Sequence, residues 1–277
     1  MLALEGLMKY DPLSSMDGLK GKLIIAIDTE TTGLKSHLPH SQILEVAAIV
    51  YDLENNKEIE TYLRNIKIEN LPTLANVLRH EKITKPDYNV KDALKLNQYS
   101  KKKNIDNLKE SMLGLQEFVD KYPDAIIVMH NAKFDMRFIN RYLSSIGAGI
   151  HNTVFDSEEF AAKFILPALK KLSKSNPDIN TMLQGTLKQR KNKNKETGEI
   201  EIKYTPSYGL QELGRAFGVK ADSAHTAISD VQQMIKIIQK MFDFVNEHAN
   251  EIVDYKQDIS KWDRRAKKKF SRRLNQK

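Results

Sequence analysis

The chain has 277 residues, of which 40% are hydrophobic and 29% charged, as in a globular protein large enough to bury a core. It has no cysteine, which excludes disulfide bonds and thiolate metal sites and agrees with a reducing compartment. The net charge of +8 lies in residues 261–277, which hold nine basic side chains and one acidic one. That distribution favours a polyanion such as nucleic acid as a partner, with a solvated, disordered tail as the alternative.

The first residues lack the basic and apolar regions of a signal peptide, and no apolar run reaches the roughly 20 residues that span a bilayer. We therefore expect a cytoplasmic protein without a membrane-bound part. The composition along the chain predicts three regions: a leader over residues 1–20, one domain over residues 21–250, and a basic tail over residues 251–277.

Three strands are predicted first in chain order. The run KLIIAIDTETTGL, residues 22–34, is typical of a buried strand that ends in a Thr/Gly turn, and residues 43–53 and 57–66 follow as two more strands. The residues Glu-Asn-Asn between them favour a hairpin turn. Residues 68–103 are polar and irregular.

Strands and helices then alternate. Apolar residues at helical spacing predict a helix over residues 104–121, and AIIVMH, residues 125–130, predicts a buried strand. A helix that stops at Gly147 follows it. Residues 152–156 predict another strand, which leads into a helix over residues 157–172.

Two helices complete the domain. A short one ends at Gly218, and the last carries an apolar stripe at spacings of three and four residues, made of Ile228, Val231, Ile235, Ile238 and Phe242. Three strands followed by alternating strands and helices predict an α/β fold with a mixed β-sheet flanked by helices.

A basic insert interrupts this pattern at residues 187–206. The alternation in EIEIKY and the turn residues before it leave two structures open, an inserted β-hairpin and a mobile basic loop. Five side chains of the insert are candidates for contact with a nucleic-acid backbone: Lys188, Arg190, Lys191, Lys193 and Lys195.

Four carboxylates are the candidates for chemistry. Asp28 and Glu30 share one face at the end of a strand that is otherwise apolar, where ligands bind in open α/β sheets. Asp135 opens the helix after the strand at residues 125–130, and Asp230 lies in the first turns of the last helix. Brought together, they would form an all-oxygen site, which favours Mg²⁺ or Mn²⁺ over Zn²⁺.

Such a site suits phosphoryl transfer with two cations about 4 Å apart on the scissile phosphate. The attacking water still needs a proton acceptor, and an imidazole is suited to that task at neutral pH. His225 stands five residues before Asp230, so it must lie outside the regular helix to point the same way.

The runs IDTETTGL, HNAKFD and HTAISD resemble the three motifs of the DEDDh 3′–5′ exonucleases, and the similarity covers roughly residues 23–242. This resemblance implies a ribonuclease H-like fold, two divalent cations and release of nucleoside 5′-monophosphates from 3′ ends. It makes the four carboxylates metal ligands and His225 the general base. It also implies contacts of the substrate with Thr29, Thr31, Leu34, Asn131 and Phe134. The basic insert and the tail are not part of the family pattern.

Several alternatives stay open. Asp135 and Asp230 could be acids favoured by helix dipoles, and His225 could be a hydrogen-bonding group at a helix entry. Tyr204 and Tyr208 could stack on bases, although packing is favoured. DNA is the favoured substrate, with an exoribonuclease or a non-catalytic binding module as rivals. The tail could bind a DNA polymerase or another replication or repair protein.

Overall fold

The computed structural model describes residues 19, 21–34, 36, 41–69, 93–95, 99–102, 105–193, 199–221 and 225–248. The expected leader lies outside them apart from Leu19, which is buried against the core, and the expected tail lies outside them entirely. Most of residues 68–103, the stretch expected to be irregular, also lies outside the described residues. The same holds for Lys195 of the basic insert.

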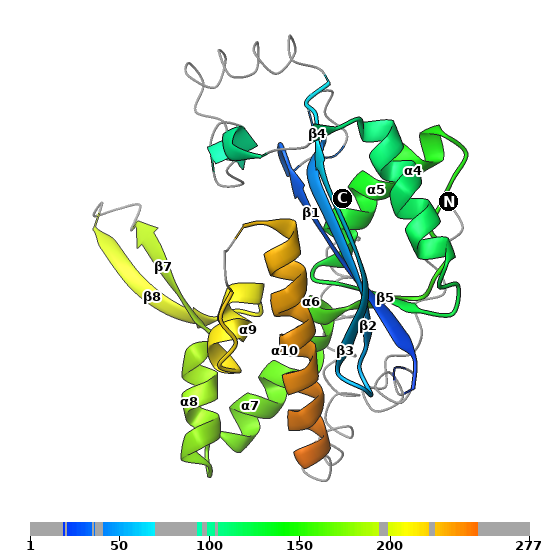
Figure 1. Ribbon diagram of the computed structural model, residues 1–277. Helices are drawn as coiled ribbons and strands as arrows, with labels where there is room; N and C mark the ends of the chain where they lie inside the picture. Colours follow the sequence, from blue (N-terminus) through cyan, green and yellow to red (C-terminus); the bar gives the residue numbers. More distant parts are fainter. Residues whose placement is uncertain are drawn as a thin grey trace, which may run out of the picture.

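A six-stranded mixed sheet forms the centre of the molecule, in the order β4-β3-β2-β1-β5-β6 (Figure 1). The first three strands form an antiparallel meander, and the remaining pairings are parallel. The strands are β1 (Leu23–Thr31), β2 (Ile43–Asp52), β3 (Lys57–Ile66), β4 (Ile105–Asp106), β5 (Ile126–Met129) and β6 (Val154–Asp156).

Helices cover both faces of the sheet, which explains why β1 is apolar on both sides. Ile25 and Ile27 face α4 (Leu108–Asp120) and α5 (Ala132–Ser145), whereas Ile24 and Ala26 face α10 (Ala227–Glu247). Figure 1 shows α10 running along the sheet, with its N-terminal end at the end of the molecule where β1 finishes. The prediction of a mixed sheet flanked by helices is confirmed.

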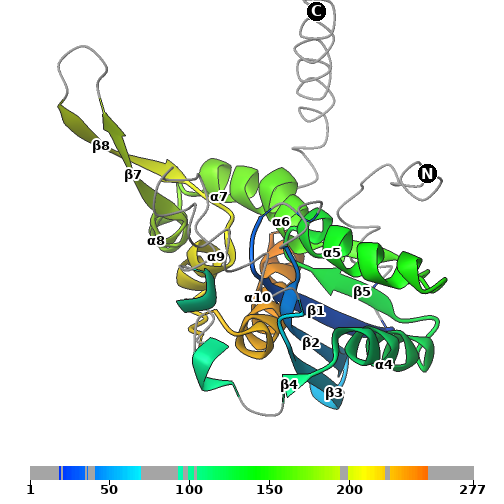
Figure 2. The same ribbon diagram turned by 90° about the horizontal axis from the view of Figure 1, so that it is seen from above.

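A smaller layer of helices extends the α10 side and carries the basic insert. It comprises α6 (Ser157–Phe160), a π-helical turn η2 (Ala161–Ile165), α7 (Leu166–Leu172), α8 (Pro177–Gly185) and α9 (Leu210–Ala216). Between α8 and α9 the insert forms an antiparallel hairpin of β7 (Leu187–Lys193) and β8 (Ile200–Pro206). Figure 2 shows this hairpin projecting away from the body of the molecule.

Two local predictions differ from the structure. The helix predicted over residues 104–121 begins at Leu108, because the side chain of Asn107 accepts hydrogen bonds from the amides of Lys109 and Glu110 and caps it. Ile105, assigned to that helix by its spacing, lies instead in β4. The helix α8 was not predicted. A short 3₁₀ turn, η1 (Tyr99–Lys101), precedes β4.

None of the helices in the described parts of the chain combines the length and apolar character needed to cross a membrane.

Candidate metal-binding active site

Three carboxylates converge where β1 ends and α10 begins. Asp28 and Glu30 follow Ile24 and Ala26 on the face of β1 that packs on α10, and Asp230 lies in the first turn of that helix. Their ligand oxygens all lie within 4.8 Å of one another, a spacing at which they could hold a metal ion. The sequence therefore brings carboxylates 200 residues apart to one point because the apolar faces below them pack together.

Asp135 approaches the same strand from its other side. Its Oδ1 accepts hydrogen bonds from the amide of Thr29 at 3.1 Å and from the Thr29 hydroxyl at 2.6 Å. Thr29 points toward α5 because side chains alternate along a strand. Among the described residues, the group within 4.8 Å comprises the other three carboxylates, so the four predicted ligands are split between two sides of β1.

Burial raises the pKa of all four carboxyls, and repulsion between neighbouring carboxylates adds to this at Asp28 and Glu30. Burial and then the charges of Asp135, Glu30 and Asp230 raise the pKa of Asp28 well above its usual range. Burial, with the charge of Asp230, raises the pKa of Glu30 to about 8. Burial raises the pKa of Asp135 to about 7 against the hydrogen bonds from Thr29, and that of Asp230 to about 6.

One oxygen of the cluster lacks a partner. Oδ1 of Asp230 is buried and finds no hydrogen-bond partner among the described residues. A buried acceptor costs free energy unless a donor or a cation satisfies it. The unsatisfied oxygen, the spacing of the carboxylates and their raised pKa values all fit a divalent cation with hard oxygen ligands.

His225 stands at the entrance of α10, in a turn with the left-handed backbone angle φ of 67°. The prediction that it lies outside the regular helix is confirmed, since Thr226 is the N-cap residue. The main chain of His225 donates to the Asp230 carboxylate, and the two side chains are close enough for the imidazole to lower the pKa of Asp230. His225 and Asp230 therefore form one local unit at the site.

Lys102 and Glu45 also belong to this region, although no sequence motif singles them out. Glu45 lies opposite Glu30 in the β1–β2 register and is 1% exposed. The Lys102 ammonium forms an ion pair with Glu45 and also lowers the pKa of Glu30. Burial lowers the pKa of Lys102. A largely buried cation thus lies close to the carboxylate cluster.

Asp156 at the end of β6 fixes the start of α5. Its carboxylate accepts hydrogen bonds from the amides of Asn131 at 3.1 Å and Ala132 at 3.0 Å, and from two amides of α6. Asn131 has a left-handed φ of 63° and makes no side-chain cap. The helix that carries Asp135 is thereby tied to the neighbouring strand.

His130 is half-buried just after β5, and its Nδ1 lies 3.0 Å from the Ser157 hydroxyl. Burial lowers the pKa of His130 to about 4, while the backbone of Tyr208 and the charge of Glu212 act in the opposite direction. The imidazole is therefore neutral at physiological pH. The sequence indicates His130 only as the first residue of the HNAKFD run, without a role of its own.

The residues expected to meet substrate have different surroundings. Leu34 is 54% exposed, as a side chain that contacts a ligand would be. The hydroxyls of Thr29 and Thr31 bond to Asp135 and to the carbonyl of Gly33. Phe134 is half-buried, with its ring 5.3 Å from that of Phe138.

The basic insert is exposed. Lys188, Arg190 and Lys191 lie on the surface of β7, and nothing is described of the Lys193 side chain. Tyr204 is 63% exposed and Tyr208 is 39% exposed. Both tyrosines are therefore exposed and not packed as expected; Tyr204 lies on the hairpin of β7 and β8, which projects from the body (Figure 2), whereas Tyr208 lies beyond its last strand.

Comparison with known proteins identifies relatives. The sequence model of an exonuclease family, RNase_T, matches residues 25–238. The chain is 27% identical over 250 residues to a PolC-type DNA polymerase III of Caldanaerobacter subterraneus subsp. tengcongensis, with 88% of this chain and 14% of that protein aligned. It is 26% identical over 235 residues to the PolC-type polymerase of Staphylococcus epidermidis, with 83% of this chain and 12% of that protein aligned. The chain thus spans a small part of these polymerases.

Solved structures show the same fold. E. coli Exonuclease I in complex with a dA16 oligonucleotide matches with a TM-score of 0.53 and 18% identity over 84% of this chain and 42% of that one. The zinc-bound complex of the same exonuclease with single-stranded DNA matches with a TM-score of 0.51 and 17% identity over the same shares. These likenesses cover most of this chain.

Proposed function

The chain is an exonuclease of the RNase_T family, and we propose that it is a DEDDh member that removes nucleoside 5′-monophosphates from 3′ ends with two divalent cations, Mg²⁺ or Mn²⁺. DNA, single-stranded or frayed at its 3′ end, is the proposed substrate. The observation that carries this proposal is the convergence of Asp28, Glu30 and Asp230, beside His225.

The carboxylate cluster supports the metal dependence. Asp28, Glu30 and Asp230 would hold the cations, with Asp135 able to join them from the other side of β1. When bound, divalent cations neutralise the scissile phosphate and lower the pKa of water. Without cations, burial and then the repulsion between like charges favour the protonated carboxyl groups.

The chain's own residues would then accept the proton and position the substrate. His225 accepts the proton of the water whose oxygen attacks the phosphorus of the terminal nucleotide. The bond between that phosphorus and the 3′ oxygen of the preceding nucleotide breaks, and this oxygen takes a proton from solvent, leaving a shortened strand with a 3′ hydroxyl and a free 5′-monophosphate. Thr29 orients Asp135 through its two hydrogen bonds. We assign contacts with the terminal nucleotides to Thr31, Leu34, Asn131 and Phe134.

A degradation assay tests the proposal. Single strands of DNA and RNA with one sequence and a 5′ label are incubated with Mg²⁺, Mn²⁺ or EDTA. We expect a ladder that shortens from the 3′ end, needs metal and forms faster on DNA. Asp28→Asn should abolish it, whereas Asp124→Asn, a change in an exposed turn, should not.

Intact substrate in every lane, with binding still measurable, would contradict the exonuclease and leave a binding module. Faster shortening of RNA would instead make the protein an exoribonuclease. Cleavage within the strand, without a 3′-end ladder, would contradict the polarity.

Residues 261–277 supply the proposed contact with a partner. Their charge supports binding to nucleic acid, and the similarity to PolC-type polymerases supports a DNA polymerase as a protein partner. Deletion of these residues should lower the salt-sensitive affinity for DNA if they bind phosphates. Unchanged affinity would favour the protein partner.

A further inference from the structure

The hairpin of β7 and β8 has two chemically different faces. Side chains that lie opposite each other in an antiparallel pair share a face. Gln189 pairs with Tyr204 and Lys191 with Ile202, so these four side chains lie on one face together with Ile200. The other face carries the cations Lys188, Arg190 and Lys203.

The first face is apolar and uncovered. Ile200 is 64% exposed, Ile202 is 51% exposed and Tyr204 is 63% exposed. They alternate along β8, so they form one continuous stripe, which we call the apolar stripe. Such a stripe on a projecting hairpin marks an interaction surface, because a side chain with a structural role would be packed.

Cations border this stripe. Lys191 lies directly opposite Ile202 on the same face, and β7 contains basic but no acidic residues. On the other face, Lys203 is partly neutralised by Glu201, whose carboxylate lies 3.0 Å from its ammonium. The apolar stripe therefore has a cationic edge along β7, which is complementary to a partner that is both flat and anionic.

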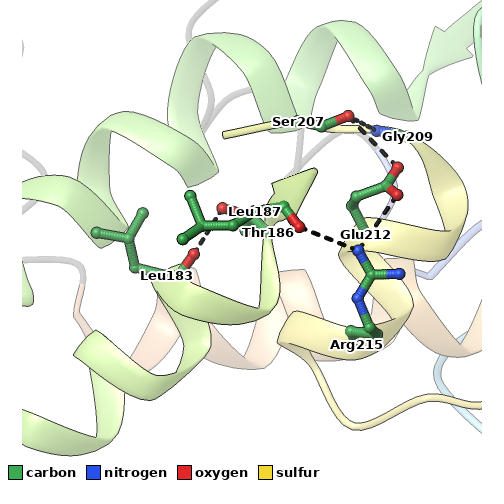
Figure 3. Close-up of polar contacts among 7 residues, drawn as sticks. All are labelled: Leu183, Thr186, Leu187, Ser207, Gly209, Glu212 and Arg215. Atoms are coloured by element: carbon green, nitrogen blue, oxygen red, sulfur yellow. Dashed lines mark hydrogen bonds and ion pairs between the residues drawn. The ribbon is translucent and has the colours of Figure 1, made fainter. Parts of the chain in front are cut away.

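Polar contacts attach the base of the hairpin to α9. The amide of Ser207 donates to the carbonyl of Thr186 at 2.9 Å. Figure 3 shows that Arg215 donates to the carbonyl of Leu187 and pairs with Glu212, at 3.2 Å. Thr186 is fully buried.

The helices beneath the base are also in close contact. A Cβ at Gly185 would lie 2.7 Å from the backbone of Ala216, so α8 and α9 touch directly. The hairpin is thus held in one direction relative to the body.

This base adjoins the candidate active site. The backbone of Tyr208 and the charge of Glu212 act on the imidazole of His130, at the end of β5 just before the helix of Asp135. In Figure 1 the hairpin rises from α9 toward the end of the molecule where α10 begins. The hairpin therefore lies on a side of the site toward which the upstream nucleotides of a bound strand would extend in the binding mode inferred below.

We infer that the apolar stripe of the β7–β8 hairpin binds the bases of a single strand upstream of the 3′ end, with Lys191 on its phosphates. This inference rests on the proposed exonuclease function. A single strand offers unstacked bases that pack on Tyr204 and the isoleucines, and it carries phosphates spaced along the cationic edge. In a duplex the faces of the bases are stacked on one another and cannot pack on side chains, so the apolar stripe would stay exposed to solvent.

Binding and turnover are measured separately to test this inference. Binding uses fluorescence anisotropy in EDTA with a labelled 30-nucleotide single strand of DNA and with a blunt duplex of the same sequence. Turnover uses a four-nucleotide DNA strand, which offers few nucleotides upstream of its 3′ end. The variants are Tyr204→Ala, Tyr204→Phe, Lys191→Gln and Lys188→Gln/Arg190→Gln.

We expect Tyr204→Ala to weaken binding of the long single strand about tenfold, as the loss of one stacked base would. Tyr204→Phe keeps the ring and should bind as the wild type does. Lys191→Gln should lower the slope of the logarithm of the binding constant against the logarithm of salt concentration by about 0.7, the value for one phosphate of a single strand. Turnover of the short strand should be unchanged in all variants.

Unchanged binding in Tyr204→Ala would overturn the inference. If the double variant Lys188→Gln/Arg190→Gln binds duplex more weakly while Tyr204→Ala binds as the wild type does, the opposite face of the hairpin binds duplex instead. If the wild type degrades neither strand while the variants still show the expected losses in binding, the exonuclease function is contradicted and the role of the hairpin is not.

Discussion

The hydroxyl of Thr29 donates to Oδ1 of Asp135 at 2.6 Å, and the amide of the same residue donates to the same oxygen at 3.1 Å. The contact joins β1 to α5 and links two motifs 106 residues apart in the chain. It keeps one carboxylate of the site in place from the side of β1 opposite to Asp28 and Glu30.

Thr29→Val removes that hydroxyl at nearly constant volume. The pKa of Asp135, already raised to about 7, should rise further because the hydroxyl bond favours the charged form. We expect activity at pH 7 to fall about tenfold, with the acid limb of the pH–rate profile moved to higher pH. Thr29→Ser keeps the donor and serves as the control. Equal profiles for the valine and serine variants would show that the hydroxyl does not position Asp135.

Metal-free stability should fall as the pH rises. Glu30 and Asp135 have pKa values of about 8 and about 7 in the folded chain, above the unfolded values of about 4. The folded state therefore binds protons more tightly, so the stabilisation is complete below about pH 4 and is lost as the pH rises through 7 and 8. Thermal unfolding in EDTA at pH 5 and pH 8 measures this loss. Glu30→Gln should lessen it, and a flat wild-type profile would contradict the raised pKa values.

Divalent cations should reverse that trend. A cation binds ionised carboxylates and competes with protons, so its affinity rises with pH. We expect Mn²⁺ to increase the midpoint temperature of unfolding more at pH 8 than at pH 6. Asp28→Asn should lose most of this increase, whereas Asp124→Asn should keep it. An increase independent of pH and of Asp28 would place the cation elsewhere.

His225→Asn separates a proton acceptor from a hydrogen-bonding group at a helix entry. Asparagine tolerates the left-handed backbone of this position and can still form hydrogen bonds, but it does not accept a proton at neutral pH. We expect the rate to fall about 10²- to 10⁴-fold. Mn²⁺ binding, followed by calorimetry, should persist. A variant that keeps its activity would favour the helix-entry role.

Lys102 should stabilise the fold through Glu45. Both side chains are largely buried, at 13% and 2% exposed, so Lys102→Met leaves a buried carboxylate without its cation. Removing one partner of a buried pair costs about 3–5 kcal/mol. The double variant Lys102→Met/Glu45→Gln should recover much of that loss. Urea unfolding of the two single variants and the double variant gives the coupling, and strictly additive losses would exclude the pair.

Local patterns were sufficient to predict most elements of the fold. The apolar runs before Asp28 and before His130 are strands, and the stripe from Ile228 to Phe242 is one helix. The pattern was misleading at Ile105, whose spacing matched α4, because the Asn107 cap and the parallel pairing of β4 with β3 make the helix start later. Periodicity does not report a cap or a strand partner.

The sequence by itself determined that carboxylates and an imidazole end up at the ends of β1, α5 and α10, since strand and helix periods are local properties of the chain. Only the tertiary structure decided that Asp28, Glu30 and Asp230 share one side of β1 while Asp135 bonds Thr29 on the other. Likewise, only the structure brought Lys102 behind Glu30 and turned the apolar stripe of the hairpin to solvent. Distances between residues far apart in the chain depend on how whole faces of strands and helices pack together. Those distances decide how deeply a carboxylate is buried and which charges act on it.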